Sequence, residues 1–379
     1  MAAAEAPVEH LDAASYVVPT ESFGETVAES DGTARWDSTG VVVVELEAAG
    51  QRGLGYAYGA PAALDIIRST LAECVIGTDA LDSTGTYWAM ARALRNTGWG
   101  GVTATALSAI DVALHDLRGR ILDVSLVRLL GGAQEEVEAY GSGGFTSYSI
   151  PHLQQQLGGW AADGFRAVKM KVGTHPASDL ERVRAAREAV GDDVELFVDA
   201  NGAYGRAQAL RFAEQYADLG VTWFEEPVSS DDLDGLRLLR DRAPGGMRIA
   251  AGEYGYTPAY FARMLASGAV HVLQADATRC GGPTGFLLAA ALAVSTGVPS
   301  SAHTAPAIHA SVACAAEGAI NVEYFHDHAR IEAQFFDGLP ALSDGLLLPD
   351  RSAPGHGLTL REPDIEAHRV QSFAAQSDH

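Results

Sequence analysis

The sequence predicts an α/β protein built on a parallel βα barrel, with a separate α+β capping unit in front of it. Two observations favour the barrel. From about residue 137, short β-rich runs alternate with amphipathic helical stretches at a spacing of roughly 25 to 28 residues. The β-rich runs are also mostly apolar until their final residues, which is typical of strands buried on both faces of a parallel sheet.

Eight candidate strands follow this pattern. They are residues 137–142, 167–172, 194–200, 222–227, 248–253, 271–276, 298–303 and 321–325. The helical stretches between them, such as 178–190 and 206–220, carry apolar residues three and four positions apart and end near a Gly or Pro. We therefore expect the barrel to occupy residues 131–325.

The flanking regions differ from the barrel in pattern. Upstream, residues 39–58 predict a hairpin, and residues 103–130 predict a pair of helices that ends at two glycines. This gives an α+β capping domain over residues 1–130. After residue 325 the periodicity fades. Residues 326–379 are expected to form a separate C-terminal segment with one short strand and a mobile tail after about residue 366.

Charge and composition exclude several classes of protein. The net charge is −23, which disfavours nucleic acid as a partner. No apolar run approaches the roughly 20 residues of a membrane span, and the first residues lack a targeting pattern, so we expect a cytoplasmic protein with no membrane partner. The three cysteines, Cys74, Cys280 and Cys314, are too widely spaced to predict a zinc site or a disulfide framework.

Three carboxylates predict a metal site. The carboxyl ends of the strands in a βα barrel meet at one mouth. Asp199, Glu225 and Glu253 end three successive predicted strands, so their side chains would repel one another unless a hard divalent cation bound them. Oxygen-only ligands favour Mg²⁺ over zinc and leave coordination positions for a substrate carboxylate. The sequence therefore predicts a Mg²⁺ site that binds a small anionic carboxylate.

Other strand ends supply candidate acids and bases. Lys169 and Lys171 lie two apart, so they point the same way, and we expect their repulsion to lower the pKa of one of them. Asp276 and His303 end neighbouring strands and predict a dyad that acts from the opposite side of the mouth. Glu323, on the last strand, is interpreted as a protonated hydrogen-bond donor to the substrate carboxylate; a surface glutamate is the alternative.

These residues stand in motifs that resemble a known family. The strings KMK, VDANGAY, WFEEP, AAGE, QADATRCGG and SSAHTAP occur in this order, after the helical text SAIDVALHDLRGR. Over nearly the whole chain they resemble the mandelate racemase subgroup of the enolase superfamily, which includes the muconate lactonizing enzymes. The resemblance implies a modified TIM barrel, (β/α)7β, whose N-terminal capping domain is completed by the C-terminal segment. It also implies a homo-oligomer.

The resemblance assigns a role to each candidate. It implies Mg²⁺ ligation by Asp199, Glu225 and Glu253, and proton abstraction next to a carboxylate through an enediolate. Lys171 would be one general base assisted by Lys169, and His303 with Asp276 the other. Glu323 would be the electrophilic acid. Asn201 and Glu226 match positions that line the metal site in relatives.

Substrate choice in this family is set largely by two cap loops. Here they correspond to residues 19–36 and 56–58, and we expect Trp36 and Tyr56 to lie near the substrate. The acidic residues of the first loop favour hydroxyl groups over a phenyl ring as its partners. They are Glu21, Glu25, Glu29 and Asp31. A flexible lid without substrate contacts is the alternative.

Dehydration of a sugar acid is the leading hypothesis for the overall reaction. Racemisation or epimerisation of a 2-hydroxy acid and cycloisomerisation of a lactone or anhydro sugar acid share its first half-reaction, so the sequence does not separate them. A non-catalytic binding barrel would be expected to lose some of these residues, and none is missing. A Schiff-base aldolase does not need three carboxylates on successive strands.

Overall fold

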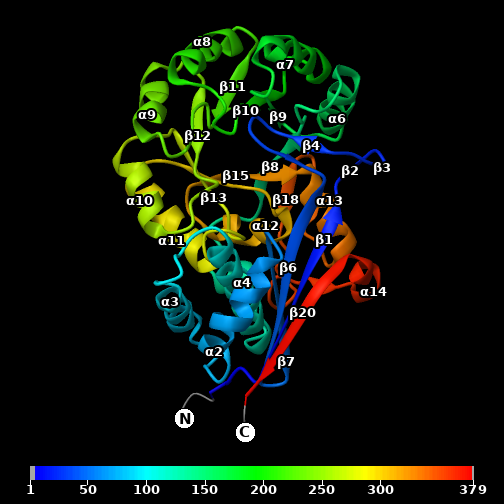
Figure 1. Ribbon diagram of the computed structural model, residues 1–379, viewed down its shortest axis with the longest axis vertical. Coiled ribbons are helices and arrows are strands. Elements are labelled where there is room, and N and C mark those ends of the chain that lie inside the picture. Colours follow the sequence, from blue (N-terminus) through cyan, green and yellow to red (C-terminus); the bar gives the residue numbers. More distant parts are fainter. Residues whose placement is uncertain (1–4, 378–379) are drawn as a thin grey trace.

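A closed barrel of eight parallel strands forms the centre of the molecule, as the computed structural model shows for residues 5–377 (Figure 1). The strands are β8 (Val137–Gly143), β9 (Ala167–Lys171), β10 (Glu195–Asp199), β11 (Val221–Glu225), β12 (Arg248–Ala251), β13 (Val272–Ala275), β14 (Ser300–Ala302) and β15 (Ala319–Phe325). Consecutive strands are neighbours, and β15 pairs with β8 to close the barrel. The predicted fold class is confirmed.

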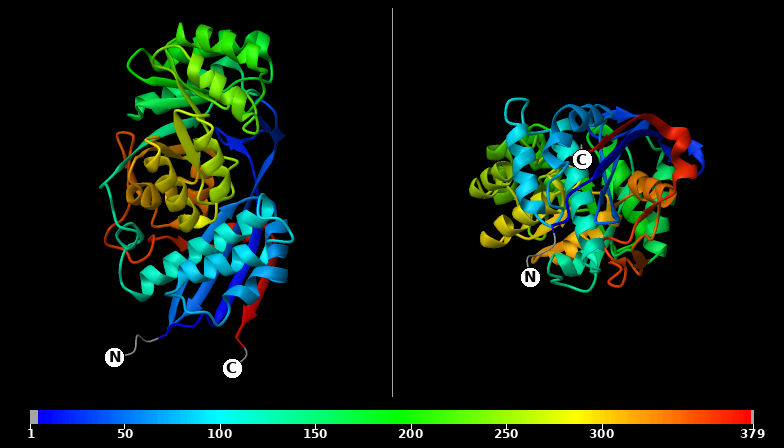
Figure 2. Two further views of the ribbon diagram at one scale, coloured as in Figure 1. Left: turned by 90° about the vertical axis from the view of Figure 1, so that its left-hand side faces the viewer. Right: turned by 90° about the horizontal axis from the view of Figure 1, so that it is seen from below.

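Seven helices connect the eight strands and cover the outside of the barrel (Figure 2). They are α6 (Ile150–Ala162), α7 (Pro176–Val190), α8 (Arg206–Ala217), α9 (Leu233–Arg242), α10 (Pro258–Ala266), α11 (Gly282–Ser295) and α12 (Pro306–Ala315). The helix α13 (His326–Phe335) follows the last strand. Among residues 5–377, none of the helices combines the length and apolar character needed to cross a membrane.

The two-residue period of the strands places an ionisable layer above an aromatic one. Phe197 and Trp223 stack with ring centroids 5.0 Å apart inside the barrel. Two residues further along the same strands come Asp199 and Glu225, which therefore point to the same interior at the carboxyl end. The barrel thus has an apolar floor and a charged mouth.

The capping domain is an antiparallel sheet covered by helices. Its strands are β1 (His10–Pro19), β6 (Ser38–Ala48), β7 (Gln51–Tyr58) and β20 (Arg369–Gln376). Its helices are α1 (Ala62–Ile66), α2 (Ala72–Val75), α3 (Ser83–Ala93), α4 (Val102–Ile121) and α5 (Leu126–Leu129), with a π-helical turn at Ile67–Leu71. Pairing of β6 with β7 confirms the predicted hairpin. A Cβ on Gly55 would lie 2.2 Å from the carbonyl oxygen of Ala109, so this glycine lets α4 pack closely on the sheet.

The prediction of a mobile tail after about residue 366 was wrong for the part that the structure describes. The strand β20 pairs with β1 along its length, from Arg369 to Gln376. Its side chains alternate between exposed and partly buried, and Phe373 and Ala375 pack against the apolar core of the cap. The segment is polar in sequence because it is an edge strand with one half-buried face.

Shorter elements complete the chain. Between β15 and β20 lie β16 (Phe336–Asp337), β17 (Ala341–Ser343), β18 (Leu346–Leu348), β19 (Thr359–Leu360), α14 (Glu362–Ile365) and a 3₁₀ turn at Glu366–His368. Between β1 and β6, residues 20–36 form two small hairpins, which we call the lid: β2 (Glu21–Ser22) with β3 (Glu25–Thr26), and β4 (Glu29–Ser30) with β5 (Arg35–Trp36). The lid connects the cap to the barrel mouth (Figure 1).

Candidate active site

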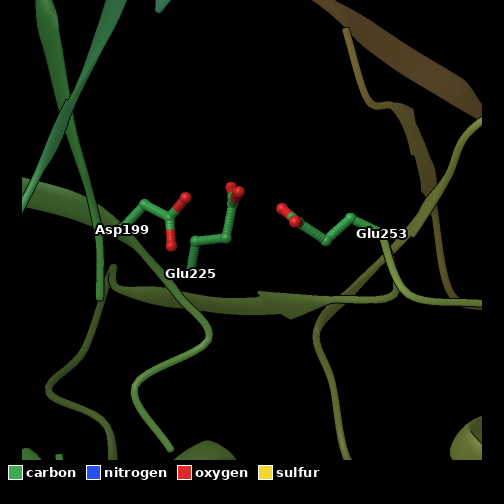
Figure 3. A group of neighbouring side chains, drawn as sticks. All are labelled: Asp199, Glu225 and Glu253. Atoms are coloured by element: carbon green, nitrogen blue, oxygen red, sulfur yellow. The ribbon is translucent and has the colours of Figure 1, made fainter. Parts of the chain in front are cut away.

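Three buried carboxyl groups converge at the barrel mouth. Asp199 and Glu225 are the last residues of β10 and β11, and Glu253 follows β12 (Figure 3). One ligand oxygen from each lies within 4.8 Å of the others, and all three residues are at most 3% exposed. Glu253 points across the mouth toward the other two, so one ion can contact all three.

The chemistry of this triad fits Mg²⁺. Glu253 Oε2 is buried without a hydrogen-bond partner among the described residues, although His303 Nε2 lies 3.3 Å from it. Burial, together with the charge of Asp199, raises the pKa of Glu225 to about 8 against the opposing effect of Lys169. A divalent cation bound by all three carboxylates would relieve this repulsion, and oxygen-only ligands are those that Mg²⁺ prefers.

The two lysines are held by the same carboxylates, which corrects the expectation for their pKa. Lys169 donates to Glu225 at 2.5 Å and lies 2.9 Å from Glu323; Lys171 donates to Asp199. Burial and the repulsion from Lys169 would lower the pKa of Lys171, but the charges of Asp199, Glu253 and Glu323 together outweigh them and raise it. Without a metal ion in the triad, both lysines are therefore charged.

His303 and Asp276 form the predicted dyad. The Nδ1 atom of His303 lies 2.9 Å from Asp276 Oδ2, and both side chains are buried. Burial would lower the pKa of His303, but Glu253 and Glu323 raise it to about 9. Its Nε2 atom lies on the side of Glu253 and Glu323, at 3.3 and 3.6 Å. The dyad thus directs one imidazole nitrogen toward the metal triad.

Glu323 is ionised in this arrangement, not protonated as the sequence led us to expect. Burial raises its pKa, but Lys169 and His303 lower it to about 2 overall. It accepts from Ser142 Oγ at 2.6 Å and from the backbone N–H of Thr304 at 3.2 Å. Glu323 therefore acts as the counter-ion of Lys169 in the barrel interior.

Strained backbone marks the same strand ends. Asn201, Glu226 and Thr304 have φ values of 46°, 36° and 55°, which L residues rarely adopt. Asn201 donates its backbone N–H to Asp199 Oδ1 at 2.8 Å, so the turn after β10 orients a metal-site carboxylate. Such strain is concentrated where surrounding structure holds it for a functional purpose.

A cavity of 290 Å³ lies between the barrel mouth and the lid. Its wall includes Lys171, Asn201, Glu253 and His303. A second cavity, of 350 Å³, lies along β1 and β20 in the cap and contains none of the predicted site residues. We therefore assign the candidate active site to the cavity at the barrel mouth.

The cap residues are divided between the cavity and the core. Trp36 lines the cavity, as expected, whereas Tyr56 is fully buried and donates to Glu332 at 2.6 Å. Its neighbour Tyr58 lines the cavity instead. Glu226 is buried beside the triad and is not part of the cavity wall.

The cavity wall includes residues of both predicted cap loops, Asp31, Ala34 and Tyr58, of which Asp31 was among the acidic residues expected to favour hydroxyl groups. The sequence assigned no site role to further residues of the wall, which are Ser38, Thr39, Gly40, Gly59, Tyr254, Arg279, Thr304, Phe325 and His328. Arg279 stands three residues after Asp276 in a motif that was recognised, which is the signal that could have found it. It lies 3.5 Å from both Glu253 and Asp276 and so links the metal triad to the dyad. Ser38, Thr39 and Gly40 lie in β6, Tyr58 in β7, Phe325 at the end of β15 and His328 in α13. Ala34, Gly59, Tyr254 and Thr304 lie in loops without a periodic pattern.

Two segments of the chain match known protein families. Residues 30–131 match the mandelate racemase / muconate lactonizing enzyme N-terminal domain, and residues 152–365 match the enolase C-terminal domain-like family. The chain is 33% identical to the 3,6-anhydro-alpha-L-galactonate cycloisomerase of Streptomyces coelicolor over 82% of this chain and 86% of that protein.

Solved structures share the fold along nearly the whole chain. A mandelate racemase/muconate lactonizing enzyme-like protein from Rubrobacter xylanophilus superposes with a TM-score of 0.93 at 49% identity, covering 96% of this chain and 100% of that one. L-talarate dehydratase from Polaromonas sp. JS666, complexed with Mg and L-glucarate, superposes with a TM-score of 0.88 at 28% identity. The match covers 98% of this chain and 100% of that one.

Proposed function

Because the chain belongs to the mandelate racemase/muconate lactonizing enzyme family, we propose that it removes the α-proton of a sugar acid and then eliminates a β-hydroxyl group. The observation that carries the proposal is a buried three-carboxylate site, two lysines and a His–Asp dyad at one barrel mouth. Glu253, Lys171 and His303 bring these three groups to the wall of one cavity. Mg²⁺, when bound by Asp199, Glu225 and Glu253, supplies Lewis-acid stabilisation of the substrate carboxylate.

The residues of the chain divide the remaining work. Lys171 and His303 reach the cavity from β9 and from the end of β14, so each can take or return a proton at a different face of the substrate. Asp276 fixes the imidazole orientation through Nδ1. Lys169, held between Glu225 and Glu323, adds positive charge next to the carboxylate as deprotonation makes it more negative.

Cycloisomerisation is the second candidate, because the cycloisomerase of S. coelicolor is 33% identical to this chain. This reaction would share the α-carbon proton transfer. In one direction the proton is removed and a ring oxygen of the substrate leaves; in the other an internal hydroxyl oxygen attacks and the proton is returned to the α-carbon.

The test is a screen of sugar acids, lactones and anhydro sugar acids in D₂O with Mg²⁺. NMR reports deuterium at C2 of recovered substrate and at C3 of a 2-keto-3-deoxy product, and semicarbazide reports a new keto group. Formation of a 2-keto acid with deuterium at C3 supports dehydration, whereas consumption of a lactone or anhydro acid supports cycloisomerisation. Absence of both exchange and keto product with every sugar acid would overturn the proposal.

A further inference from the structure

Asp31 is an acidic side chain of the cavity wall that has no role in the reaction proposed above. It lies in the lid between β4 and β5 and is 8% exposed. It belongs neither to the metal triad nor to the dyad. Burying a carboxylate costs free energy of folding unless hydrogen-bond donors or cations surround it, so the contacts of Asp31 show what holds it there.

The lid holds Asp31 in a fixed position. Its Oδ1 atom accepts from the backbone N–H groups of Thr33 and Ala34 at 2.6 and 2.7 Å. Its carbonyl oxygen accepts from Thr146 Oγ1 at 3.0 Å and from Thr174 Oγ1. These contacts fasten the residue to the loops that follow β8 and β9.

The next residue shows how closely the lid approaches the barrel. A Cβ on Gly32 would lie 2.1 Å from the carbonyl oxygen of Ala200 and 2.8 Å from that of Val172, so only glycine allows this contact. Asp31 is therefore placed by backbone packing against the ends of β9 and β10. The hydrogen bonds that residues 5–377 donate to its side chain all go to Oδ1, which leaves Oδ2 as an acceptor oxygen for a ligand in a fixed carboxylate.

The cations of the cavity wall are already paired. Lys171 donates to Asp199, and Arg279 lies 3.5 Å from both Glu253 and Asp276. His303 is bound to the same Asp276. Among the described residues that line the cavity, none offers a cation free of a carboxylate partner for a second substrate carboxylate.

Any such group would lie in the 290 Å³ cavity that Asp31 helps to line. A second carboxylate that lay on the lid side of this cavity would be repelled by the charge of Asp31, because salt screens partly buried charges less than exposed ones. A hydroxyl group would instead donate a hydrogen bond to the free carboxylate oxygen.

We propose that Asp31 determines specificity by accepting hydrogen bonds from substrate hydroxyl groups and repelling a second carboxylate, so that the enzyme selects sugar monoacids over sugar diacids. The inference rests on the proposed function and narrows its substrate class. Family membership does not decide this point, because the relatives include a cycloisomerase named for an anhydrogalactonate and a dehydratase complexed with L-glucarate.

The experiment compares kcat/KM for aldonic acids with that for aldaric acids of matching configuration, in wild type, Asp31→Asn and Glu25→Gln. Asparagine keeps the acceptor oxygen that binds the lid backbone but removes the charge. Glu25 is exposed on the same lid and is the matched control. We expect wild type and the control to favour monoacids by about tenfold or more, and Asp31→Asn to shift the ratio toward diacids by about tenfold.

Equal or better turnover of diacids by wild type would overturn the inference, as would an unchanged ratio in folded Asp31→Asn. The wild-type preference is measured without any variant, so it tests the inference even if Asp31→Asn does not fold. α-Proton exchange with diacids alone would leave the proposed function intact and refute only the role of Asp31. Absence of exchange with both classes would refute the proposed function and this inference with it.

Discussion

The barrel mouth and the lid contribute to one cavity but are built in opposite ways. At the mouth, ionisable side chains come from strands that are paired on both sides, and five of these side chains are at most 1% exposed: Lys169, Asp199, Glu225, Asp276 and Glu323. The lid consists of two-residue strands fastened by a few hydrogen bonds and one glycine contact. The proposed proton transfers would thus depend on rigid strands, whereas the proposed substrate selection would depend on how accurately a short loop docks.

The largest effect on activity is expected from Glu225→Gln, which changes the proposed metal site at the barrel mouth. It removes a metal-site charge while the side chain keeps its shape beside Lys169 and Trp223. We expect α-proton exchange to fall by roughly 10⁴-fold with an unchanged circular dichroism spectrum. Glu195→Gln, at the opposite end of β10, is the control. Near-normal exchange by Glu225→Gln at low Mg²⁺ would contradict the site assignment.

The two proposed bases, Lys171 and His303, should each exchange the α-proton on a different face of the substrate. Lys171 and the His303 strand are separated by β8 and β15 on one side and by β10 to β13 on the other. We expect His303→Asn to lose exchange with one configuration at C2 by roughly 10²- to 10⁴-fold, and Lys171→Ala to lose it with the other. NMR in D₂O with both epimers measures this. If His303→Asn stopped exchange with every substrate and Lys171→Ala with none, Lys171 would be only an electrostatic residue.

Gly32→Ala tests the docking of the lid. The added Cβ cannot be accommodated next to Ala200, so the lid must shift away from the barrel. We expect kcat/KM to fall by about 10- to 100-fold, chiefly through KM, with the Mg²⁺ affinity unchanged. Gly159→Ala in α6, where a Cβ has open space, is the control. An unchanged KM in Gly32→Ala would mean that the lid does not help to bind the substrate.

The smallest effect is on stability and concerns Glu29 in the lid. Burial, with the charge of Asp327, raises its pKa to about 8, so the folded protein holds a proton that the unfolded chain releases near pH 4.5. Between these values the free energy of unfolding should fall as pH rises, by at most about 1.4 kcal/mol per unit. Glu29→Gln should remove this slope.

Urea titrations from pH 5 to pH 9 measure the difference between wild type and Glu29→Gln. The control is Glu25→Gln, because it removes a carboxylate of the same lid that is exposed to solvent and not buried. If the free energy of unfolding changed with pH in the same way in wild type and Glu29→Gln, the raised pKa of Glu29 in the folded protein would be contradicted.

The barrel and its strand ends were predictable because both follow from one local rule. An apolar run stops where the chain leaves the parallel sheet, and the next side chain faces the mouth. The rule predicts that Asp199, Glu225 and Glu253 meet at the mouth, and one carboxylate oxygen of each lies within 4.8 Å of the others. It also predicts that Asp276 and His303 are neighbours, and Asp276 Oδ2 lies 2.9 Å from His303 Nδ1. The rule needs no knowledge of distant contacts.

Features that depend on distant contacts were not predictable. The proton state of Glu323 depends on Lys169, whose strand β9 lies six strands before β15 in the sequence, and on His303. That of Lys171 depends on Asp199, Glu253 and Glu323. The polar sequence of the tail predicts a mobile segment, because it carries no sign of the strand with which it pairs. The acidic residues of the lid were predicted only as a group, and of the four only Asp31 lines the cavity. That Asp31 and Arg279 face the cavity depends on loop geometry, which residue type alone does not reveal.

Pairing of β20 with β1 also sets the order in which the molecule can be completed during synthesis. His10 lies opposite Gln376, and β1 is the strand between β6 and β20. The ribosome releases β1 before the barrel and β20 after it, so one edge of β1 stays open while the whole barrel emerges. A chain that terminates after residue 368 would therefore carry all the proposed catalytic residues together with an unpaired edge, which favours association with other nascent chains.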